Sequence, residues 1–357
     1  MPRRRHHHGL PTNPGMSPGS LVIPEGALKP RVRVVRYDAS GIEARDHVSL
    51  PEMQRLAEAP EVTWIDIEGY GDRELLEFLE ARLGVPRLAL EDVLGNNSRP
   101  KLEPFGEALF VVARAMKTGE HPESEQLSLF VRGTTVITFS DEPLDLLASL
   151  RQRLHDPQSM TRRSGVDFLV YRILDCVVDS YTPCLEHLGT RLDLVEAEAI
   201  ARPSSRPLNT LYVLMRDLRV LARIALPMRE LAVALSHEAR GFFRPETLPF
   251  LSDLREHTQS VVELSAHYRD LGTDVRELIH GALNLRMNQV MRLMTAITTV
   301  FIPMSFVTGL YGMNFENMPE TRWPYGYFLV LGALATIALF TLRWLRAQGW
   351  TRVNEDE

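Results

Sequence analysis

The sequence predicts an α/β domain, then a long α-helical stalk, and then two membrane-spanning helices. Short runs of β-forming residues separated by turn residues fill the region from Arg31 to Ser140. Helical periodicity with few interruptions then runs from Gly165 to Gly312. Two stretches near the C-terminus, 293–312 and 327–342, contain no charged residue. Each approaches the roughly 20 residues that a helix needs to cross a bilayer.

The N-terminal domain alternates predicted strands with predicted helices. Five apolar runs indicate strands: RVRVVRY (31–37), VTWIDIEGY (62–70), GEALFVVARAM (106–116), EQLSLFV (125–131) and TTVITFS (134–140). Apolar residues at helical spacing indicate helices over 72–83, 86–94 and 143–154. Asp66 and Glu68 alternate with apolar residues in the second strand, which is typical of a solvated strand face. We therefore assign these two carboxylates no chemistry.

Three long helices are predicted for the stalk: 165–200, then 207–241 returning antiparallel across a hairpin at 202–207, and a nearly continuous helix over 245–312. The last would be about 100 Å long at 1.5 Å per residue. Its apolar positions step alternately by three and four, the pattern of a supercoiled bundle whose partners would be copies of the same chain. These seam positions are Val261, Leu264, Tyr268, Leu271, Val275, Leu278, Ala282 and Leu285.

The residues that flank the two apolar stretches predict their orientation. Arg286 and Arg292 precede the first stretch, and Arg343, Arg346 and Arg352 follow the second. The positive-inside rule therefore places both termini in the cytoplasm and the connecting loop outside. Because the N-terminus lacks the apolar core of a signal peptide, the α/β domain is expected to stay cytoplasmic. We expect a multi-pass protein of the cell's inner (plasma) membrane.

The expected organisation has seven parts. They are a disordered N-terminal tail (1–30), which includes the solvated run His6-His7-His8, a cytoplasmic α/β domain (31–160), a long-helix stalk (161–290), a first transmembrane helix that lines a pore (291–312), an extracytoplasmic loop (313–326), a second transmembrane helix (327–345) and a cytoplasmic tail (346–357).

A narrow polar stripe follows one face of the first apolar stretch. Its positions, again at steps of three and four, are Asn288, Met291, Thr295, Thr298, Ile302, Ser305, Gly309 and Gly312. Polar groups inside a bilayer face the bundle interior or water, so the stripe is the predicted pore lining. Met291, Met294 and Ile302 would form apolar constrictions that stop ions by dewetting. The alternative is that the Thr and Ser hydroxyls bond back to their own helix.

The end of this stretch carries a sequence signature. Tyr311-Gly312-Met313-Asn314-Phe315-Glu316 is followed by Met318-Pro319-Glu320 and then by Trp323 and Tyr325-Gly326-Tyr327. Placed between two C-terminal spans, this segment resembles the pore mouth of the CorA family of magnesium and cobalt channels. The resemblance covers most of the chain after about Arg31. It implies a homopentameric funnel with a cytoplasmic α/β domain, in which the second span packs outside the first.

In this interpretation Gly312, Met313 and Asn314 form the selectivity filter. Magnesium gives up its hydration water reluctantly. A ring of neutral Asn314 amide oxygens, one per subunit, would accept hydrogen bonds from those waters without stripping the ion, and so allow both entry and exit. Glu316 and Glu320, behind the ring, would concentrate divalent cations at the pore mouth.

The resemblance also implies a regulatory magnesium site between subunits, which holds the channel closed when intracellular magnesium is bound. Glu91 and Asp92 match the acidic segment of this site, Asp253 and His257 match the facing positions on the long helix, and Asp175 matches a third position. Asp253 and His257 are four residues apart and share a helix face. The alternative is that these are ordinary solvated side chains.

Composition and missing motifs argue against other classes of protein. A net charge of −6 argues against a nucleic-acid partner. The sequence lacks a phosphate-binding glycine loop, a nucleophile elbow and a helical histidine pair, so we expect no enzyme and no organic cofactor. Cys176 and Cys184, eight residues apart on one helix, would stand roughly 12 Å apart and cannot pair.

The sequence therefore predicts a homopentameric channel for magnesium influx, with cobalt and nickel as further candidate ions and magnesium as the regulatory ligand. A zinc transporter of the ZntB type is the first alternative, because it shares the architecture but usually varies the middle residue of the tripeptide, Met313 here. A membrane-anchored binding or signalling module is the second. A membrane-tethered hydrolase comes last.

Overall fold

The structure is a computed structural model that describes residues 17, 19–96, 98–117, 119–201, 204, 206–239, 241–314, 318 and 323–348. The chain divides into two compact units. The first comprises Met1–Leu194 and Thr210–Thr273, and it contains the β-sheet. The second comprises Val195–Asn209 and Asp274–Glu357, and it contains both apolar stretches.

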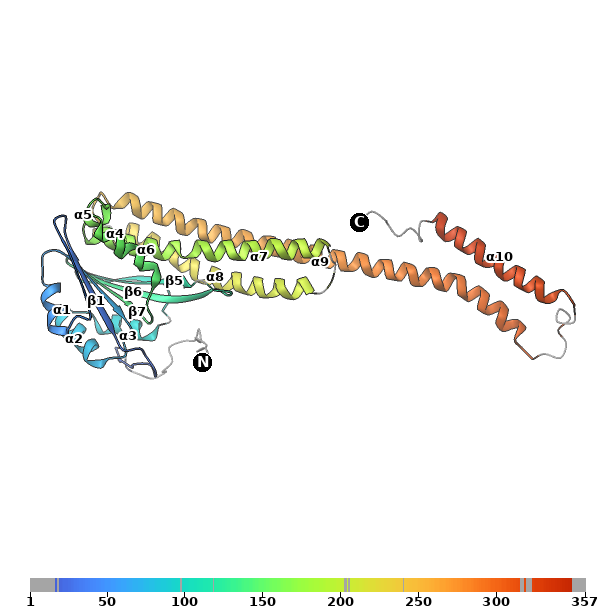
Figure 1. Ribbon diagram of the computed structural model, residues 1–357, viewed down its shortest axis with the longest axis horizontal. Helices are drawn as coiled ribbons and strands as arrows, with labels where there is room; N and C mark the ends of the chain where they lie inside the picture. Colours follow the sequence, from blue (N-terminus) through green and yellow to red (C-terminus); the bar gives the residue numbers. More distant parts are fainter. Residues whose placement is uncertain are drawn as a thin grey trace. The chain divides into compact units, whose positions relative to one another are not determined.

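The first unit is built on a seven-stranded sheet with the order β2-β1-β3-β7-β6-β5-β4 (Figure 1). Neighbouring strands are antiparallel except β3 and β7, which are parallel. The strands are β1 (Arg31–Tyr37), β2 (Ile42–Asp46), β3 (Val62–Glu68), β4 (Lys101–Phe105), β5 (Ala108–Lys117), β6 (Glu123–Arg132) and β7 (Thr135–Ser140). All five predicted strands are present. The two that the sequence did not predict, β2 and β4, are the short edge strands, where charges and Pro104 mask the apolar alternation.

Helices α1 (Leu50–Ala57), α2 (Arg73–Leu83) and α3 (Arg87–Gly95) cover one face of the sheet (Figure 1). The shared core includes Ile65, Phe110 and Phe139 from the strands and Leu79 and Leu90 from the helices, and all five are essentially buried. The boundaries of α2 follow from local chemistry. The Asp72 carboxylate accepts a hydrogen bond from the Glu74 N–H at 2.9 Å, and Gly84 ends the helix in the left-handed conformation.

The other face of the sheet is also covered, which corrects the prediction for Asp66 and Glu68. Both side chains are buried, not solvated, with Asp66 only 3% exposed. Asp66 accepts hydrogen bonds from Thr138 Oγ1 and from Arg151 Nη1 of α4 (Ala148–His155), both at 2.7 Å. The 143–154 helix begins as the 3₁₀ turn η1 (Asp145–Leu147). The polar and apolar residues that alternate along β3 therefore lie on two faces that are both buried. The polar face, which was expected to meet water, is covered by α4.

The predicted helix over 165–200 is two helices, α6 (Val166–Asp179) and α7 (Tyr181–Ala201), preceded by the short α5 (Met160–Arg163). Pro183 explains the break, since its ring would clash with the carbonyl of Asp179 in a continuous helix. The junction residue Ser180 is fixed by two bonds: its hydroxyl donates to Val177 O at 2.5 Å and accepts from the Met116 N–H at 2.8 Å.

The remaining long helices are α8 (Arg206–His237) and α9 (Leu248–Tyr311). The 64 residues of α9 confirm the nearly continuous helix, which runs through Pro303. The seam prediction is wrong in part. The buried positions of α9 in the first unit are Leu251, Leu254, Thr258, Val261, Ser265 and Gly272. Nearby, Gly272 lies against Met215 of α8 and Tyr268 against Gly189 of α7, so helices of the same chain supply the partners. Leu264 and Leu285 remain exposed.

The second unit contains two helices apolar enough to cross a membrane. These are the C-terminal part of α9 and α10 (Gly326–Ala347), with mean hydropathies of 1.7 and 2.0 over their most apolar windows. Only 6% and 11% of those windows are buried in the chain. A core helix of a water-soluble protein would be mostly buried, so these exposed apolar surfaces favour a bilayer environment.

The predicted disordered tail extends too far along the chain. The segment 19–30 is placed on the first unit: Leu21 and Ile23 pack on the core of the sheet domain, and the Gly71 N–H donates to Leu28 O at 2.8 Å. The sequence reading missed this because Pro and Gly obscure any strand or helix period there. His6 to His8 lie outside the described residues, as do Arg202, Pro203 and Ser205 of the predicted hairpin and the C-terminal residues 349–357.

Candidate functional site

The predicted filter tripeptide lies immediately after the end of α9. The helix ends at Tyr311, and the Gly312 N–H donates to Thr308 O at 3.0 Å and to Gly309 O at 3.2 Å. The Met313 N–H donates to Leu310 O at 3.3 Å. Met313 and Asn314 are exposed in the single chain, so the Asn314 amide is not used in packing. The predicted acidic residues of the pore mouth, Glu316 and Glu320, lie outside the described residues.

The predicted pore stripe lies on an exposed face of α9. Its members Asn288, Met291, Thr295, Thr298, Ile302, Ser305, Gly309 and Gly312 are all exposed, as is Met294 beside them. The positions of the same segment that the chain covers, fully or in part, are Ala296, Thr299, Val300, Pro303, Met304 and Val307. At 100° per residue the centres of these two sets lie about 150° apart around the helix axis. The stripe therefore lies opposite the covered face, on a segment where other positions, such as Phe301 and Phe306, are exposed as well.

The hydroxyls of this stripe bond to their own helix. Thr295 Oγ1 donates to Met291 O at 2.8 Å, and Thr298 Oγ1 donates to Met294 O at 2.6 Å. The sequence left open the alternative that these hydroxyls bond to their own helix, and both threonine hydroxyls do so. Each hydroxyl oxygen keeps a lone pair that can accept a hydrogen bond from water. The bonds are thus compatible with both a lipid-facing and a water-facing stripe.

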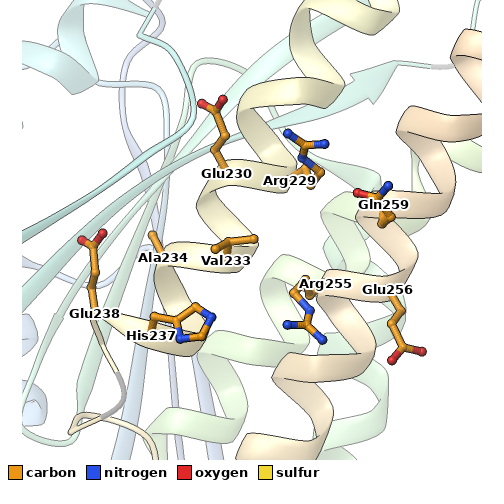
Figure 2. Close-up of a pocket in the computed structure, with 9 residues that line it drawn as sticks. All are labelled: Arg229, Glu230, Val233, Ala234, His237, Glu238, Arg255, Glu256 and Gln259. Atoms are coloured by element: carbon orange, nitrogen blue, oxygen red, sulfur yellow. The ribbon is translucent and has the colours of Figure 1, made fainter.

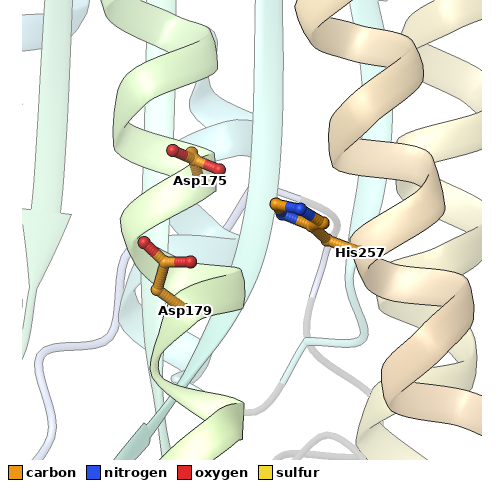
Figure 3. Close-up of side chains that lie close together, drawn as sticks. All are labelled: Asp175, Asp179 and His257. Carbon is orange, nitrogen blue, oxygen red and sulfur yellow. The ribbon is translucent and has the colours of Figure 1, made fainter.

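A second group of polar residues lies in the first unit, on α6 and α9. Ligand atoms of Asp175, Asp179 and His257 all lie within 4.8 Å of one another (Figure 3). His257 Nε2 also lies 3.6 Å from Asp253 Oδ1, one turn earlier on α9. The structure therefore brings together three residues that the sequence proposed, Asp175, Asp253 and His257. It adds Asp179, which the sequence reading missed although the four-residue spacing from Asp175 on a helix was available as a signal.

This group, the α6–α9 cluster of Asp175, Asp179, Asp253 and His257, combines carboxylate oxygens with an imidazole nitrogen. Burial raises the pKa of Asp175, Arg172 opposes the shift through an ion pair, and Asp179 and Asp253 add to it. Mutual repulsion of carboxylates is relieved when a cation sits between them. Oxygen ligands suit Mg²⁺, and the imidazole extends the range to first-row transition metals. The donor set therefore fits a divalent cation.

The other two predicted regulatory residues have different partners in the single chain. Glu91 Oε2 accepts the Gly19 N–H at 2.6 Å. Asp92 accepts Ser98 Oγ at 2.8 Å and Lys101 Nζ at 2.7 Å. None of these partners belongs to the α6–α9 cluster.

Comparisons with known proteins agree with this architecture. Residues 60–347 match the family described as CorA-like Mg²⁺ transporter protein. The cobalt/magnesium transport protein CorA of Thermotoga maritima is 28% identical over 346 residues, which cover 96% of this chain and 98% of that protein. The protein YfjQ of Bacillus subtilis is 31% identical over 297 residues, which cover 83% of this chain and 92% of that protein.

A solved structure has the same fold. The complete structure of the CorA magnesium transporter from Methanocaldococcus jannaschii superimposes with a TM-score of 0.76 at 22% identity, and the match covers 89% of this chain and 98% of that one. The two proteins thus share a fold in which an α/β domain is followed by a long helix and two apolar helical segments. The family is one of transporters and not of enzymes. The chain belongs to the CorA-like Mg²⁺ transporter family.

Proposed function

We propose that the protein is a homopentameric channel that conducts Mg²⁺ inward across the inner (plasma) membrane, with both termini in the cytoplasm. The single observation that carries this proposal is the exposed polar stripe of α9, which ends at Gly312, two residues before Asn314. A membrane helix that turns a polar row away from its own chain needs a polar environment for that row. A ring of identical helices around a water-filled axis provides one.

The filter chemistry follows from the hydration of the ion. A ring of Asn314 amides can accept hydrogen bonds from the waters of hydrated Mg²⁺, and a neutral ring binds the ion weakly enough for it to leave. Gly312 carries no side chain at this constriction and frees its carbonyl to help. Glu316 and Glu320 would raise the local cation concentration outside. A membrane potential that is negative inside then drives the ion inward with about 2.3 kcal/mol per charge per 100 mV.

The α6–α9 cluster supports regulation by cytoplasmic divalent cations. In the proposed assembly, Glu91 and Asp92 of one subunit face this cluster on the next. A cation bound between the two groups relieves repulsion among the carboxylates, so it favours the closed spacing of neighbouring subunits. To bind the metal, Asp92 would have to exchange its present partners Ser98 and Lys101, and Glu91 would have to exchange the Gly19 N–H.

Ion flux into liposomes tests the proposal. The purified protein is reconstituted, and entry of Mg²⁺, Co²⁺, Ni²⁺ and Zn²⁺ is measured for the natural sequence, for Asn314→Ala, and for Asn209→Ala as an exposed control on α8. The proposal predicts Mg²⁺ entry that Asn314→Ala abolishes and Asn209→Ala leaves intact. Selective Zn²⁺ entry would instead favour the ZntB-type alternative. If no cation enters the liposomes, the channel proposal fails and the alternative of a membrane-anchored binding or signalling module is favoured.

A further inference from the structure

A groove lies between α8 and α9 of the first unit, and its α9 residues belong to the same turns as Asp253 and His257. It has a cavity volume of about 610 Å³. The apolar side chain of Val233 forms its floor, and Arg229, Arg255 and Gln259 stand on its sides (Figure 2). Ligand pockets commonly have volumes of roughly 300–1,000 Å³, so the groove is large enough for an organic ligand.

The groups that face the groove are hydrogen-bond donors. The guanidinium groups of Arg229 and Arg255 and the amide of Gln259 border it, and the His237 imidazole points toward it from α8 (Figure 2). Three glutamates also belong to its walls, but their carboxylates point elsewhere. Those of Glu230 and Glu238 extend from the side of α8 that faces away from α9, and that of Glu256 extends away from α8 (Figure 2). The side chains that point into the groove therefore carry more positive charge than the full set of lining residues does.

Both arginines lack an acidic partner within the part of the chain that the structure describes. Other arginines of this unit pair with carboxylates, such as Arg151 with Asp66, Arg172 with Asp175 and Arg244 with Asp167. The guanidinium of Arg229 is half-buried beside the groove and that of Arg255 is exposed on the opposite wall. Each offers a planar fork of donors that matches phosphate oxygens in pairs.

The geometry points to a binding site for a polyphosphate anion, with a nucleoside di- or triphosphate as the ligand class. Two guanidinium forks on separate helices suit an anion with several oxygens spread over more than one centre. A chain of phosphate groups has them, whereas one carboxylate would satisfy only one fork. The apolar floor at Val233 offers contact area for the nucleoside. This inference does not depend on ion conduction.

Such a ligand would connect α8 to α9. Arg229 and Arg255 lie on different helices, so a phosphate chain that engages both adds a link absent from the free protein. Because only the folded chain presents the two arginines together, ligand binding should raise the melting temperature.

Binding to the full-length protein in detergent tests the inference. ATP, inorganic triphosphate and adenosine are titrated by calorimetry in EDTA, so that no divalent cation can bridge ligand and protein. Arg229→Gln and Arg255→Gln are each compared with Arg223→Gln, an exposed arginine of α8 outside the groove. Arg255→Gln is the safer variant for folding because its side chain is exposed, and melting temperatures without ligand verify that each variant folds.

The expected result is saturable binding of ATP that each groove variant weakens about tenfold or more, while Arg223→Gln has no effect. Equal binding of triphosphate means that phosphate alone is recognised, and weaker binding of triphosphate means that the nucleoside contributes. Either supports the inference. It is overturned if neither ATP nor triphosphate binds, if adenosine binds as well as ATP, or if Arg255→Gln binds as the natural sequence does.

Discussion

His257 Nε2 lies 3.6 Å from Asp253 Oδ1, on consecutive turns of α9. Both side chains are about half exposed, at 51% and 52%. A pair with this exposure adds little to stability. Its significance lies instead in its neighbours on α6, since Asp175 and Asp179 place two further oxygen ligands within reach of the same imidazole.

The first prediction concerns Asp179, the ligand that the sequence reading missed. Asp179→Asn should weaken Co²⁺ binding to the cluster by about tenfold, because one charged oxygen ligand is lost and the imidazole ligand remains. Calorimetric titration with Co²⁺ measures the change. Asp270→Asn, an exposed aspartate of α9 outside the cluster, is the matched control. Unchanged Co²⁺ affinity in Asp179→Asn would remove this residue from the site.

The second prediction concerns stability without metal. Because burial raises the pKa of Asp175 above that of the unfolded chain, its ionisation costs folding free energy once the pH rises through the folded-state pKa. Asp175→Asn should therefore raise the melting temperature at pH 7.5 in EDTA. The gain should shrink as the pH falls through the carboxyl range, where Asp175 is protonated and neutral. A lower melting temperature at pH 7.5 would mean that the ion pair with Arg172 outweighs burial.

The third prediction concerns Asp167, at the start of α6. Its carboxylate accepts hydrogen bonds from Arg244 N, Nε and Nη2 and from Thr247 Oγ1, at 2.6–3.1 Å. Burial alone would raise its pKa, but these bonds outweigh burial and hold the pKa below its usual value. Asp167→Ala should destabilise the first unit by roughly 2 kcal/mol at pH 7.

The pH dependence of this contribution has a definite sign. A lowered folded-state pKa gives stability that is complete above the unfolded pKa and is lost as the pH falls through the folded pKa. The difference in unfolding free energy between Asp167→Ala and the natural sequence should therefore become smaller under acid conditions. Thermal melting followed by the fluorescence of buried Trp64 measures it, and Asp193→Ala, an exposed aspartate of α7, is the control. If the difference in unfolding free energy grows as the pH falls, the pKa of Asp167 is not lowered in the folded chain.

The fourth prediction concerns Arg151, which pairs with buried Asp66 across the second face of the sheet. Arg151→Ala leaves that buried carboxylate without its ion-pair partner, with only the more distant charge of Arg33 nearby, and should cost about 3 kcal/mol of unfolding free energy. Adding Asp66→Asn should recover part of the loss, because the amide needs no counter-charge. Arg153→Ala, an exposed arginine of the same helix, should have little effect. If the double variant is no more stable than the single one, burial of the charge is not the cause.

The fold could be predicted from the sequence where one physical pattern dominates. The central strands, helix α2 and the long apolar helices all follow from local composition, and the structure confirms them. The break at Ser180 was also available in principle, because Pro183 lies four residues after the carbonyl that it excludes. The burial of Asp66 was not. A strand with alternating polarity looks the same whether its polar face meets water or an arginine from a distant helix.

The candidate sites divide in the same way. The exposed stripe of α9 could be predicted because its period is a property of one helix. The α6–α9 cluster depends on how α6 packs beside α9, so sequence spacing indicates its members on each helix but not their meeting. The groove at Arg229 and Arg255 has no sequence signature, since charged residues on two helices separated by a turn are ordinary. The partners of Glu91 and Asp92 across subunits stay a prediction.

Cysteine accessibility on two faces of α9 tests the central claim most directly. Single cysteines replace Thr298 and Ser305 on the stripe, and Val300 and Val307 on the covered face, in a background where Cys176 and Cys184 are changed to Ser. Burial raises the pKa of both native thiols to about 11, which makes them poor nucleophiles even if one is retained. Each variant is reconstituted in liposomes and treated with a positively charged methanethiosulfonate reagent.

The account predicts that the reagent blocks Mg²⁺ entry through the Thr298→Cys and Ser305→Cys proteins and leaves flux through Val300→Cys and Val307→Cys unchanged. It is contradicted if the reagent leaves flux through both stripe variants unchanged, or if the covered-face variants are blocked equally.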